Sequence, residues 1–191
     1  MAVGSRRAWY WEDLVPEDGK AFRRPPGEDL AAMRLALNGK PGAVPALWRL
    51  HRARNRDELA RIGLVSDAIV AEHYAFGLFG VHQQSRSQLM HAPGVELGTA
   101  VRRLHTSGAA SKDGIDAVFT AAATATTPAG VFGRLRGLVD QLNSLKQPFD
   151  YTQLVMDLRF WDRPEQRTRI RVRWGNAYHA WSGVQNEETA V

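Results

Sequence analysis

Apolar residues along this chain recur at intervals of three and four, the spacing that places them on one face of an α-helix. The clearest series is Val131, Leu135, Leu138, Leu142 and Leu145, whose members are four, three, four and three residues apart. Runs that alternate apolar and polar residues around an Asn-Gly or Asp-Gly turn, the signal of a β-hairpin, are absent. The pattern predicts an all-α protein.

In the first half of the chain the pattern predicts four helical segments and one polar loop. The helices are expected over residues 29–38, 45–52 and 95–107, with one long helix or a broken pair over residues 57–81 and the loop over residues 83–94. Gly108 is expected to end the fourth segment. Between residues 57 and 81, the side chains expected to face the core are Leu59, Ile62, Val65, Ile69, Phe76 and Phe79.

The second half predicts four more helices, over residues 113–126, 127–147, 150–161 and 162–181. Thr127 followed by Pro128 is a typical N-cap and first helical residue. Asp162 and Glu165 have the spacing of a capping box at the start of the last helix. The inward positions are predicted to be Ile115, Val118, Phe119 and Ala122 in the first of these helices and Ile170, Trp174, Ala177, Tyr178 and Trp181 in the last.

A segment of small and polar residues, 107–114, separates the two halves and is the best candidate for a linker. We therefore predict two small helical bundles joined by this linker: an N-terminal helical domain over residues 1–108 and a C-terminal four-helix domain over residues 113–181. Short connections between the helices favour antiparallel neighbours in each bundle. Residues 182–191 are expected to form a polar tail.

The composition excludes several classes of protein. The 191 residues include no cysteine, which excludes disulfide scaffolds, thiol catalysis and Cys-ligated metals. No apolar run is long enough for a membrane span, and no secretory signal is present, so a cytoplasmic protein is expected. The signatures of P-loop, dinucleotide-binding, serine-hydrolase and zinc-protease sites are also missing. No cofactor, metal site or catalytic residue is predicted; Asp113 and Asp116 are interpreted as helix-start carboxylates.

The charge is basic and consists mostly of arginine. The net charge is +5, and 21 of the 25 basic residues are arginine. Residues 31–112 hold eleven bases and five acids, for a net charge of +6, and residues 159–174 hold six bases and two acids, for +4. Arginine binds phosphate through a planar fork of donors and stacks on bases, which favours a polyanion partner. A codon bias in a GC-rich genome is an equally good explanation of the arginine content.

Projecting residues 162–181 on a helix places Arg167 and Arg171 on one flank of the apolar stripe and Arg169 and Arg173 on the other. One flank could bind a polyanion while the other pairs with acids of a neighbouring helix; the alternative is a solvated helix surface. The candidate nucleic-acid-binding residues in the whole chain are Arg34, Arg52, Arg54, Arg102, Arg103, Arg134, Arg136, Arg169, Arg171 and Arg173.

The order of several short motifs resembles a known family. A Trp-rich start is followed by Pro45-Ala-Leu-Trp-Arg-Leu50, Glu96-Leu-Gly-Thr-Ala-Val-Arg-Arg-Leu104, Gly114-Ile-Asp-Ala-Val-Phe119, Phe149-Asp-Tyr-Thr-Gln-Leu154 and Phe160-Trp-Asp-Arg-Pro-Glu165. Over about residues 8–181 this order is similar to CasB, the small subunit of the type I-E CRISPR Cascade surveillance complex. One position departs from the family, because Thr99 stands where the family often has arginine, and Arg102 and Arg103 follow one turn later.

The resemblance implies an all-helical subunit without catalytic activity that takes part in antiviral defense. Its expected partners are the guide RNA, both strands of the target DNA, a second copy of itself and the other Cascade subunits CasA, CasC, CasD and CasE. Its implied role is to bind RNA and DNA backbones without sequence preference and so stabilise the R-loop and its displaced strand. A helical protein-interaction or regulatory domain that does not bind nucleic acid is the alternative.

Overall fold

The computed structural model describes residues 9–15 and 21–180, and within them the secondary structure is helical apart from one isolated β-bridge between His91 and Phe149. The all-α prediction is therefore confirmed. The elements are η1 (Tyr10–Leu14), α1 (Gly27–Leu35), η2 (Pro45–Leu47), α2 (Asp57–Arg61), α3 (Asp67–His82), α4 (Leu97–Ser107), α5 (Lys112–Thr124), α6 (Pro128–Ser144), α7 (Tyr151–Phe160) and α8 (Pro164–His179). Trp181 and the predicted tail, 182–191, lie outside the described residues.

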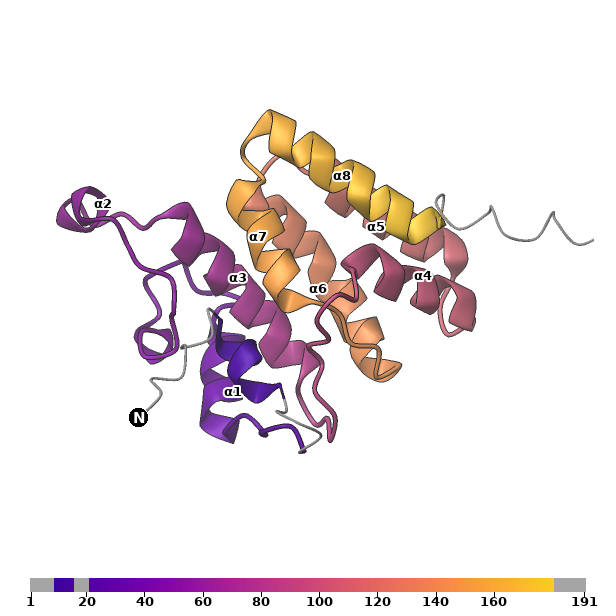
Figure 1. Cartoon of the computed structure of the whole chain (residues 1–191), viewed down its shortest axis with the longest axis horizontal. Coiled ribbons are helices and arrows are strands. Elements are labelled where there is room, and N and C mark those ends of the chain that lie inside the picture. The colour runs from indigo at the N-terminus through magenta and orange to yellow at the C-terminus, as the bar shows by residue number, and fades with distance from the viewer. Residues whose placement is uncertain (1–8, 16–20, 181–191) are drawn as a thin grey trace, which may run out of the picture.

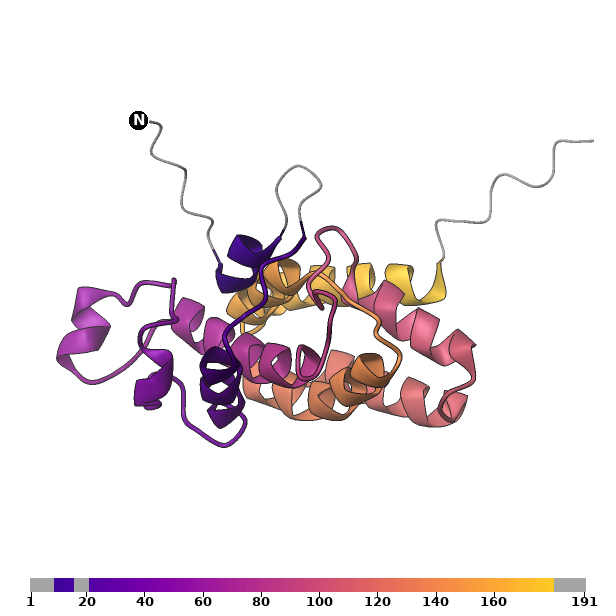
Figure 2. The same cartoon turned by 90° about the horizontal axis from the view of Figure 1, so that it is seen from below.

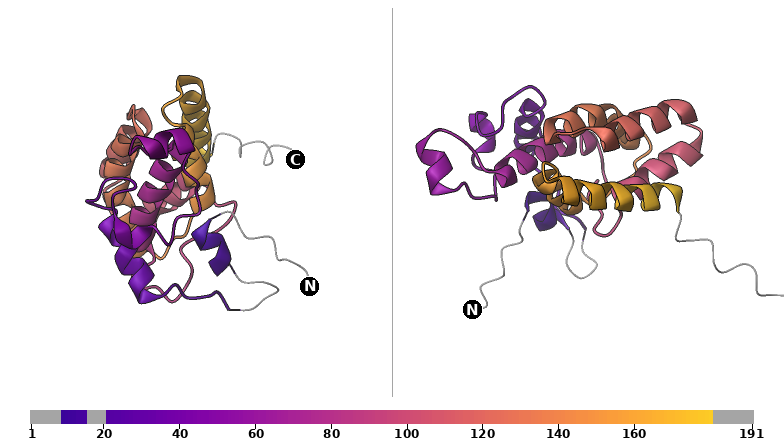
Figure 3. Two further views of the ribbon diagram at one scale, coloured as in Figure 1. Left: turned by 90° about the vertical axis from the view of Figure 1, so that its left-hand side faces the viewer. Right: turned by 90° about the horizontal axis from the view of Figure 1, so that it is seen from above.

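The molecule is elongated, with α2 at one end and α4, α5 and α8 at the other (Figures 1 and 2). Helix α3 crosses the middle and packs against α1, α6 and α7. At the far end α4 packs on α8, and α5 packs on α6 (Figure 3). We call residues 38–66 the arm: this segment holds η2, whose Leu47 is buried in the core, and α2, which projects beyond the helical body (Figure 1).

Helix α3 is buried on nearly all sides because neighbouring helices cover it from different directions. Its buried residues include Phe76, Leu78 and Phe79, which cannot lie on a single helical face. Gly80 allows α1 to approach closely, since a Cβ there would lie 2.9 Å from Cβ of Met33. A glycine at this position is therefore a packing requirement.

Two groups of aromatic side chains form the ends of one continuous core. Near α3, the fully buried Trp11 has its ring centroid 5.5–6.4 Å from those of Phe76, Phe79, His91 and Tyr151. In the far half, Trp174 contacts the rings of Phe119 and Trp161, with centroids 5.7 and 5.1 Å away. The indole N–H of Trp11 donates to Thr152 Oγ1 at 3.0 Å and so ties η1 to α7.

The arm contains the largest differences from the sequence prediction. The helix predicted over residues 45–52 is only the single turn η2, followed by turn bonds from the Leu50 and His51 N–H groups to the Leu47 carbonyl. The chain does not continue as a helix, because the N–H groups of Arg52 and Ala53 donate to the buried carboxylate of Glu72 at 2.8 and 3.0 Å. The segment 57–81 is a broken pair, α2 and α3. Gly63 ends α2 in the left-handed region at φ +71°.

Three residues predicted to be inward are exposed: Ile62 in the arm, Val118 on α5 and Leu145 after α6. In α6 the predicted cap is confirmed, since Thr127 Oγ1 accepts a hydrogen bond from the Gly130 N–H at 3.1 Å. The prediction of a capping box with Asp162 as the N-cap is wrong. Helix α8 begins one residue later than that motif requires, because Pro164 has the backbone geometry of a first helical residue and thereby makes Arg163 the N-cap.

The division into two domains at residues 108–113 stays a prediction. The predicted end of α4 is confirmed, with Gly108 in the left-handed region at φ +72°. Helix α4, from the N-terminal side of the proposed boundary, packs mainly on α8 and also contacts α5 and α6. The halves also meet where α3 packs on α6 and α7, and through the bond from Trp11 to α7, so contacts between them extend along the body of the protein.

Gly98 is where α4 and α8 come closest. A Cβ at Gly98 would lie 2.5 Å from the backbone oxygen of Trp174 and 2.9 Å from Cβ of Ala177. We expect Gly98→Ala to force the helices apart and to lower the free energy of unfolding by about 1–3 kcal/mol. Gly137→Ala in α6 is the matched control: nothing lies within 4 Å of its Cβ, so it should be neutral or stabilising by up to about 1 kcal/mol. Urea unfolding measures both; equal effects would contradict the close packing.

Two buried histidines predict a pH dependence of stability. Burial is the main cause that lowers the pKa of His82 to about 3 and that of His91 to about 4. Both are neutral in the folded protein, whereas in the unfolded chain each takes up a proton near pH 6.5. The free energy of unfolding should therefore fall as the pH drops from about 7 to 4, by up to about 1.4 kcal/mol per pH unit for each histidine.

The test compares urea unfolding of wild type and His82→Gln at pH 7.5 and pH 5. The variant should lose less stability between these two pH values than wild type does, because one neutral buried imidazole has been removed. Gln141→Asn, at an exposed position on α6 without a titratable group, is the control and should follow wild type. A variant with the same pH dependence as wild type would show that His82 does not titrate differently in the two states.

Candidate nucleic-acid interface

The arginines of α8 are divided between internal contacts and solvent. Ile170, Trp174 and Tyr178 face the core. On the flank toward α5, the Arg171 guanidinium donates to the backbone oxygens of Ala123, through a short contact, and Ala125, at 3.1 Å. These carbonyls lie at the C-terminal end of α5, where helix carbonyls lack partners and carry partial negative charge.

Arg167 belongs to the same flank and has the same kind of contact. Its guanidinium donates to the backbone oxygens of Thr126 at 3.1 Å and Trp161 at 3.2 Å. This flank therefore holds the end of α5 and the start of the following loop against α8. Its two arginines satisfy backbone acceptors of the protein itself.

On the other flank, Arg173 is paired with acids and Arg169 is exposed. The Arg173 guanidinium donates to the carboxylate of Asp157, which is buried, and lies 3.9 Å from Glu96 Oε2. Burial raises the pKa of Asp157, while its bonds to Arg173, Gln153 and Trp174 act in the opposite direction. Arg169 has no hydrogen-bond or ion-pair partner within residues 9–15 and 21–180.

The arginines of α4 and α6 lie mainly at the surface. Arg103 is exposed, and Arg102 is half-buried with its Nε unpartnered in the described part of the chain. On α6, Arg134 donates to the Gly130 carbonyl at 3.0 Å and Arg136 reaches the Leu37 carbonyl at 3.4 Å. Both remain exposed, and their backbone contacts leave other guanidinium donors available.

The packing of α4 on α8 brings two predicted groups of arginines into one region. Glu96 lies beside Arg173, and the ring of His105 is 5.8 Å from that of Tyr178, so α4 follows the C-terminal half of α8. Arg102 and Arg103 thus lie along the same pair of helices as Arg169 and Arg173.

The remaining predicted arginines lie near the opposite end of the molecule. Arg34 is half-buried on α1, and Arg54 is exposed in the arm. Arg52 pairs with Asp13, with its Nη2 atom 2.7 Å from Oδ2. They are separated from the α4–α8 region by the body of the protein (Figure 1). The structure therefore does not bring the ten predicted arginines into one cluster: Arg102, Arg103, Arg169, Arg171 and Arg173 lie on α4 and α8, Arg134 and Arg136 on α6, and Arg34, Arg52 and Arg54 on α1 and in the arm.

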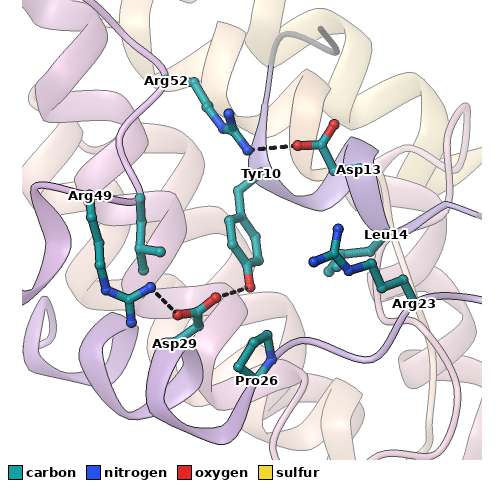
Figure 4. Close-up of a pocket in the computed structure, with 9 residues that line it drawn as sticks. Tyr10, Asp13, Leu14, Arg23, Pro26, Asp29, Arg49 and Arg52 are labelled. Carbon is teal, nitrogen blue, oxygen red and sulfur yellow. Dashed lines mark hydrogen bonds and ion pairs between the residues drawn. The ribbon is translucent and has the colours of Figure 1, made fainter. Parts of the chain in front are cut away.

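Sequence reasoning missed a pocket of about 210 Å³ beside Tyr10. Arg23, Arg49 and Arg52 surround the Tyr10 ring on three sides in Figure 4. The Tyr10 hydroxyl donates to Asp29 Oδ2 at 2.6 Å, and the Arg49 guanidinium lies 2.5 Å from Asp29 Oδ1. Burial and the bonded Asp29 raise the pKa of Tyr10. The signal was partly present, because Arg49 and Arg52 belong to the densest arginine run of the sequence.

In residues 9–15 and 21–180, no group of three or more His, Asp or Glu side chains is arranged to hold a metal ion. No helix in that same part of the chain has the length and apolar character needed to cross a membrane.

The fold and the surface together define an all-helical protein with exposed arginines on several of its helices. A model of the CRISPR-associated protein Cse2 family matches residues 29–179. The chain therefore belongs to the Cse2 family. The resemblance to CasB inferred from the motifs is confirmed by this match and by solved structures.

Two solved structures are similar to this one. CasB from Thermobifida fusca is 27% identical in sequence, with a TM-score of 0.61 over 80% of this chain and 84% of that chain. A Cse2-family CRISPR-associated protein from Thermus thermophilus is 21% identical, with a TM-score of 0.59 over 80% and 86% of the two chains, and shows the same fold. No curated protein matches the chain.

The two arginines of one α8 flank are expected to differ in their effect on stability. Arg173→Gln removes the charged partner of the buried Asp157 and should lower the free energy of unfolding by about 2–3 kcal/mol. Arg169→Gln removes the same charge from an exposed position and should change it by less than about 0.5 kcal/mol. Urea unfolding at pH 7.5 compares them; equal losses would show that the Arg173–Asp157 contact does not stabilise α8.

Proposed function

We propose that this protein is a non-catalytic small subunit of a type I-E CRISPR Cascade complex that binds nucleic-acid backbones. The observation that carries the proposal is the set of exposed arginines Arg54, Arg103 and Arg169, for which the described residues offer no ion-pair or hydrogen-bond partner to the guanidinium. An exposed guanidinium without an internal acid keeps its full set of donors for phosphate. Membership of the Cse2 family supports the proposal that this binding takes place within a CRISPR Cascade complex.

The proposed role is to stabilise the R-loop formed by the guide RNA and target DNA, together with the displaced strand. Exchange of a DNA duplex for an RNA–DNA heteroduplex is nearly balanced in free energy, so protein contacts to the backbone can favour the opened state. Contacts to phosphate carry no sequence information, which suits a subunit that must accept every guide. No cofactor is proposed, because backbone binding requires none.

The proposed partners follow from this role. They are the guide RNA, both strands of the target, the Cascade subunits CasA, CasC, CasD and CasE, and a second copy of this chain, in the cytoplasm. Of the ten predicted arginines, Arg52 and Arg173 are paired with acids and Arg171 holds two backbone carbonyls. We propose that the other seven contribute more to binding: Arg34, Arg54, Arg102, Arg103 and Arg169, together with Arg134 and Arg136, which remain exposed although each contacts one carbonyl.

A protein-only interaction domain is the second candidate, and the arm favours it. Trp48, Ile62 and Leu64 are 63%, 68% and 55% exposed, which is unusual for large apolar side chains close together in the sequence of one projecting segment. Trp48 is held in place by a bond from its indole N–H to the Gly42 carbonyl at 2.9 Å. A partner subunit could cover these side chains whether or not the protein also binds nucleic acid.

A charge-matched pair of double variants tests the nucleic-acid proposal. Arg103→Gln with Arg169→Gln should weaken binding to single-stranded DNA of any sequence, and should flatten the log–log salt dependence by about 0.7 for each lost phosphate contact. Lys40→Gln with Lys112→Gln removes the same charge from two other exposed sites and should have a smaller effect on both quantities. Fluorescence anisotropy over a salt series measures them.

The two candidate functions give different results in this experiment. Equal losses in the two double variants would contradict the assignment of Arg103 and Arg169 as contacts. No salt-dependent binding by wild type, either alone or in the assembled complex, would favour the protein-only domain.

A further inference from the structure

We propose that the pocket beside Tyr10 binds a phosphate group through Arg23, Arg49 and Arg52. As the source of this phosphate we infer the backbone of bound nucleic acid, and that part of the inference rests on the function proposed above. Neither Arg23 nor Arg49 was among the arginines predicted from the sequence.

The charged side chains lining the pocket have an excess of one positive charge. Three arginines and two aspartates line it. Arg52 is 2.7 Å from Asp13, and Arg49 is 2.5 Å from Asp29 and 3.7 Å from the exposed Glu28 outside the lining. Arg23 has no ion-pair partner in the described part of the chain and accounts for the excess.

The guanidinium groups retain donors that the aspartates do not use. Each guanidinium has five N–H donors in a planar fork, and a single carboxylate contact occupies one edge of it. The Nε of Arg52 is buried and has no hydrogen-bond partner among the described residues. Because this Nε is buried, a ligand in the pocket accepts instead from the Nη donors that the aspartates leave unused.

The bonds to Asp29 reduce the repulsion that an incoming anion would meet. Asp29 is almost fully buried; its Oδ2 accepts a hydrogen bond from the Tyr10 hydroxyl, and its Oδ1 forms an ion pair with the Arg49 guanidinium 2.5 Å away. Its charge is therefore compensated on both oxygens. Tyr10 keeps its proton, because its pKa is raised by burial and by the bonded Asp29, and so adds no second negative charge.

The size and geometry of the pocket favour a small tetrahedral oxyanion such as phosphate over a carboxylate. At about 210 Å³ it is smaller than the sites of drug-sized ligands, which begin at about 300 Å³, and it is large enough for a phosphate group. Arg49 and Arg52 come from the arm and Arg23 from the segment before α1, and the three side chains approach from different sides (Figure 4). A tetrahedral oxyanion can accept bonds from several directions, whereas a carboxylate offers two oxygens in one plane.

Arg23 and Arg24 provide a matched pair of variants. Both are exposed and adjacent in sequence, but Arg23 lines this pocket and Arg24 lines another. The full-length protein is titrated with inorganic phosphate, with sodium chloride at equal ionic strength as reference, while the Nε–Hε resonances of its arginines are followed by NMR. Saturable shifts of Arg23 and Arg52 are expected. Arg23→Gln should weaken phosphate binding about tenfold, and Arg24→Gln should leave it unchanged.

A second variant is expected to tighten phosphate binding instead of weakening it. Asp13→Asn removes the carboxylate that competes for Arg52 and should tighten phosphate binding. Absence of saturable shifts, or equal effects of Arg23→Gln and Arg24→Gln, would overturn the pocket as a phosphate site.

Single-stranded oligothymidylate then identifies the source of the phosphate. If it is nucleic acid, the oligonucleotide displaces inorganic phosphate from the pocket, and Arg23→Gln lowers its salt slope by about 0.7 while Arg24→Gln does not. Phosphate binding without displacement would overturn the nucleic-acid source and leave a free-phosphate site. If the proposed function is wrong, the wild-type protein does not bind the oligonucleotide at all, whereas inorganic phosphate still binds to the pocket.

Discussion

The orientation of α8 depends on one buried carboxylate, that of Asp157 on α7. It accepts bonds from the Arg173 guanidinium, from the Trp174 indole N–H at 2.8 Å and from Gln153 Nε2 at 3.0 Å. Burial of an unpaired charge is very unfavourable, so each of these bonds offsets part of a large desolvation cost. Because Arg173 and Trp174 are consecutive residues of α8, both can reach Asp157 only within a narrow range of helix rotation. The rest of the α8 surface follows from this rotation.

Once the rotation of α8 is set, its arginines have different roles for geometric reasons. Arg167 and Arg171 face the end of α5 and bind carbonyls there, and Arg169 projects away from the helices. The net charge of +4 in residues 159–174 therefore overstates what a ligand meets. On this one helix, arginine therefore has two roles: Arg167 and Arg171 hold α8 against α5, and Arg169 is left exposed.

Sequence periodicity was sufficient to predict those features that depend on residues close to one another in the chain. The inward stripe of α6 from Val131 to Leu142, the cap at Thr127 and the end of α4 at Gly108 all depend on residues within a few positions. The arm was predicted less well because its backbone bonds to Glu72, about 20 residues away. Periodicity also overestimated burial at Ile62 and Leu145, which lie beyond the ends of their helices.

The candidate site was harder to predict for the same physical reason. Whether an arginine is available to a ligand depends on which acids and carbonyls lie within about 3 Å of it, and these come from distant parts of the chain. Arg52 pairs with Asp13, which is 39 positions away, whereas Arg54, only two residues later, is exposed. Counting charges by segment ranks these two arginines equally. Only the tertiary packing separates an arginine that holds the fold from one that can hold a phosphate, and in the pocket beside Tyr10 a single arginine can do both, because its planar fork has more than one edge.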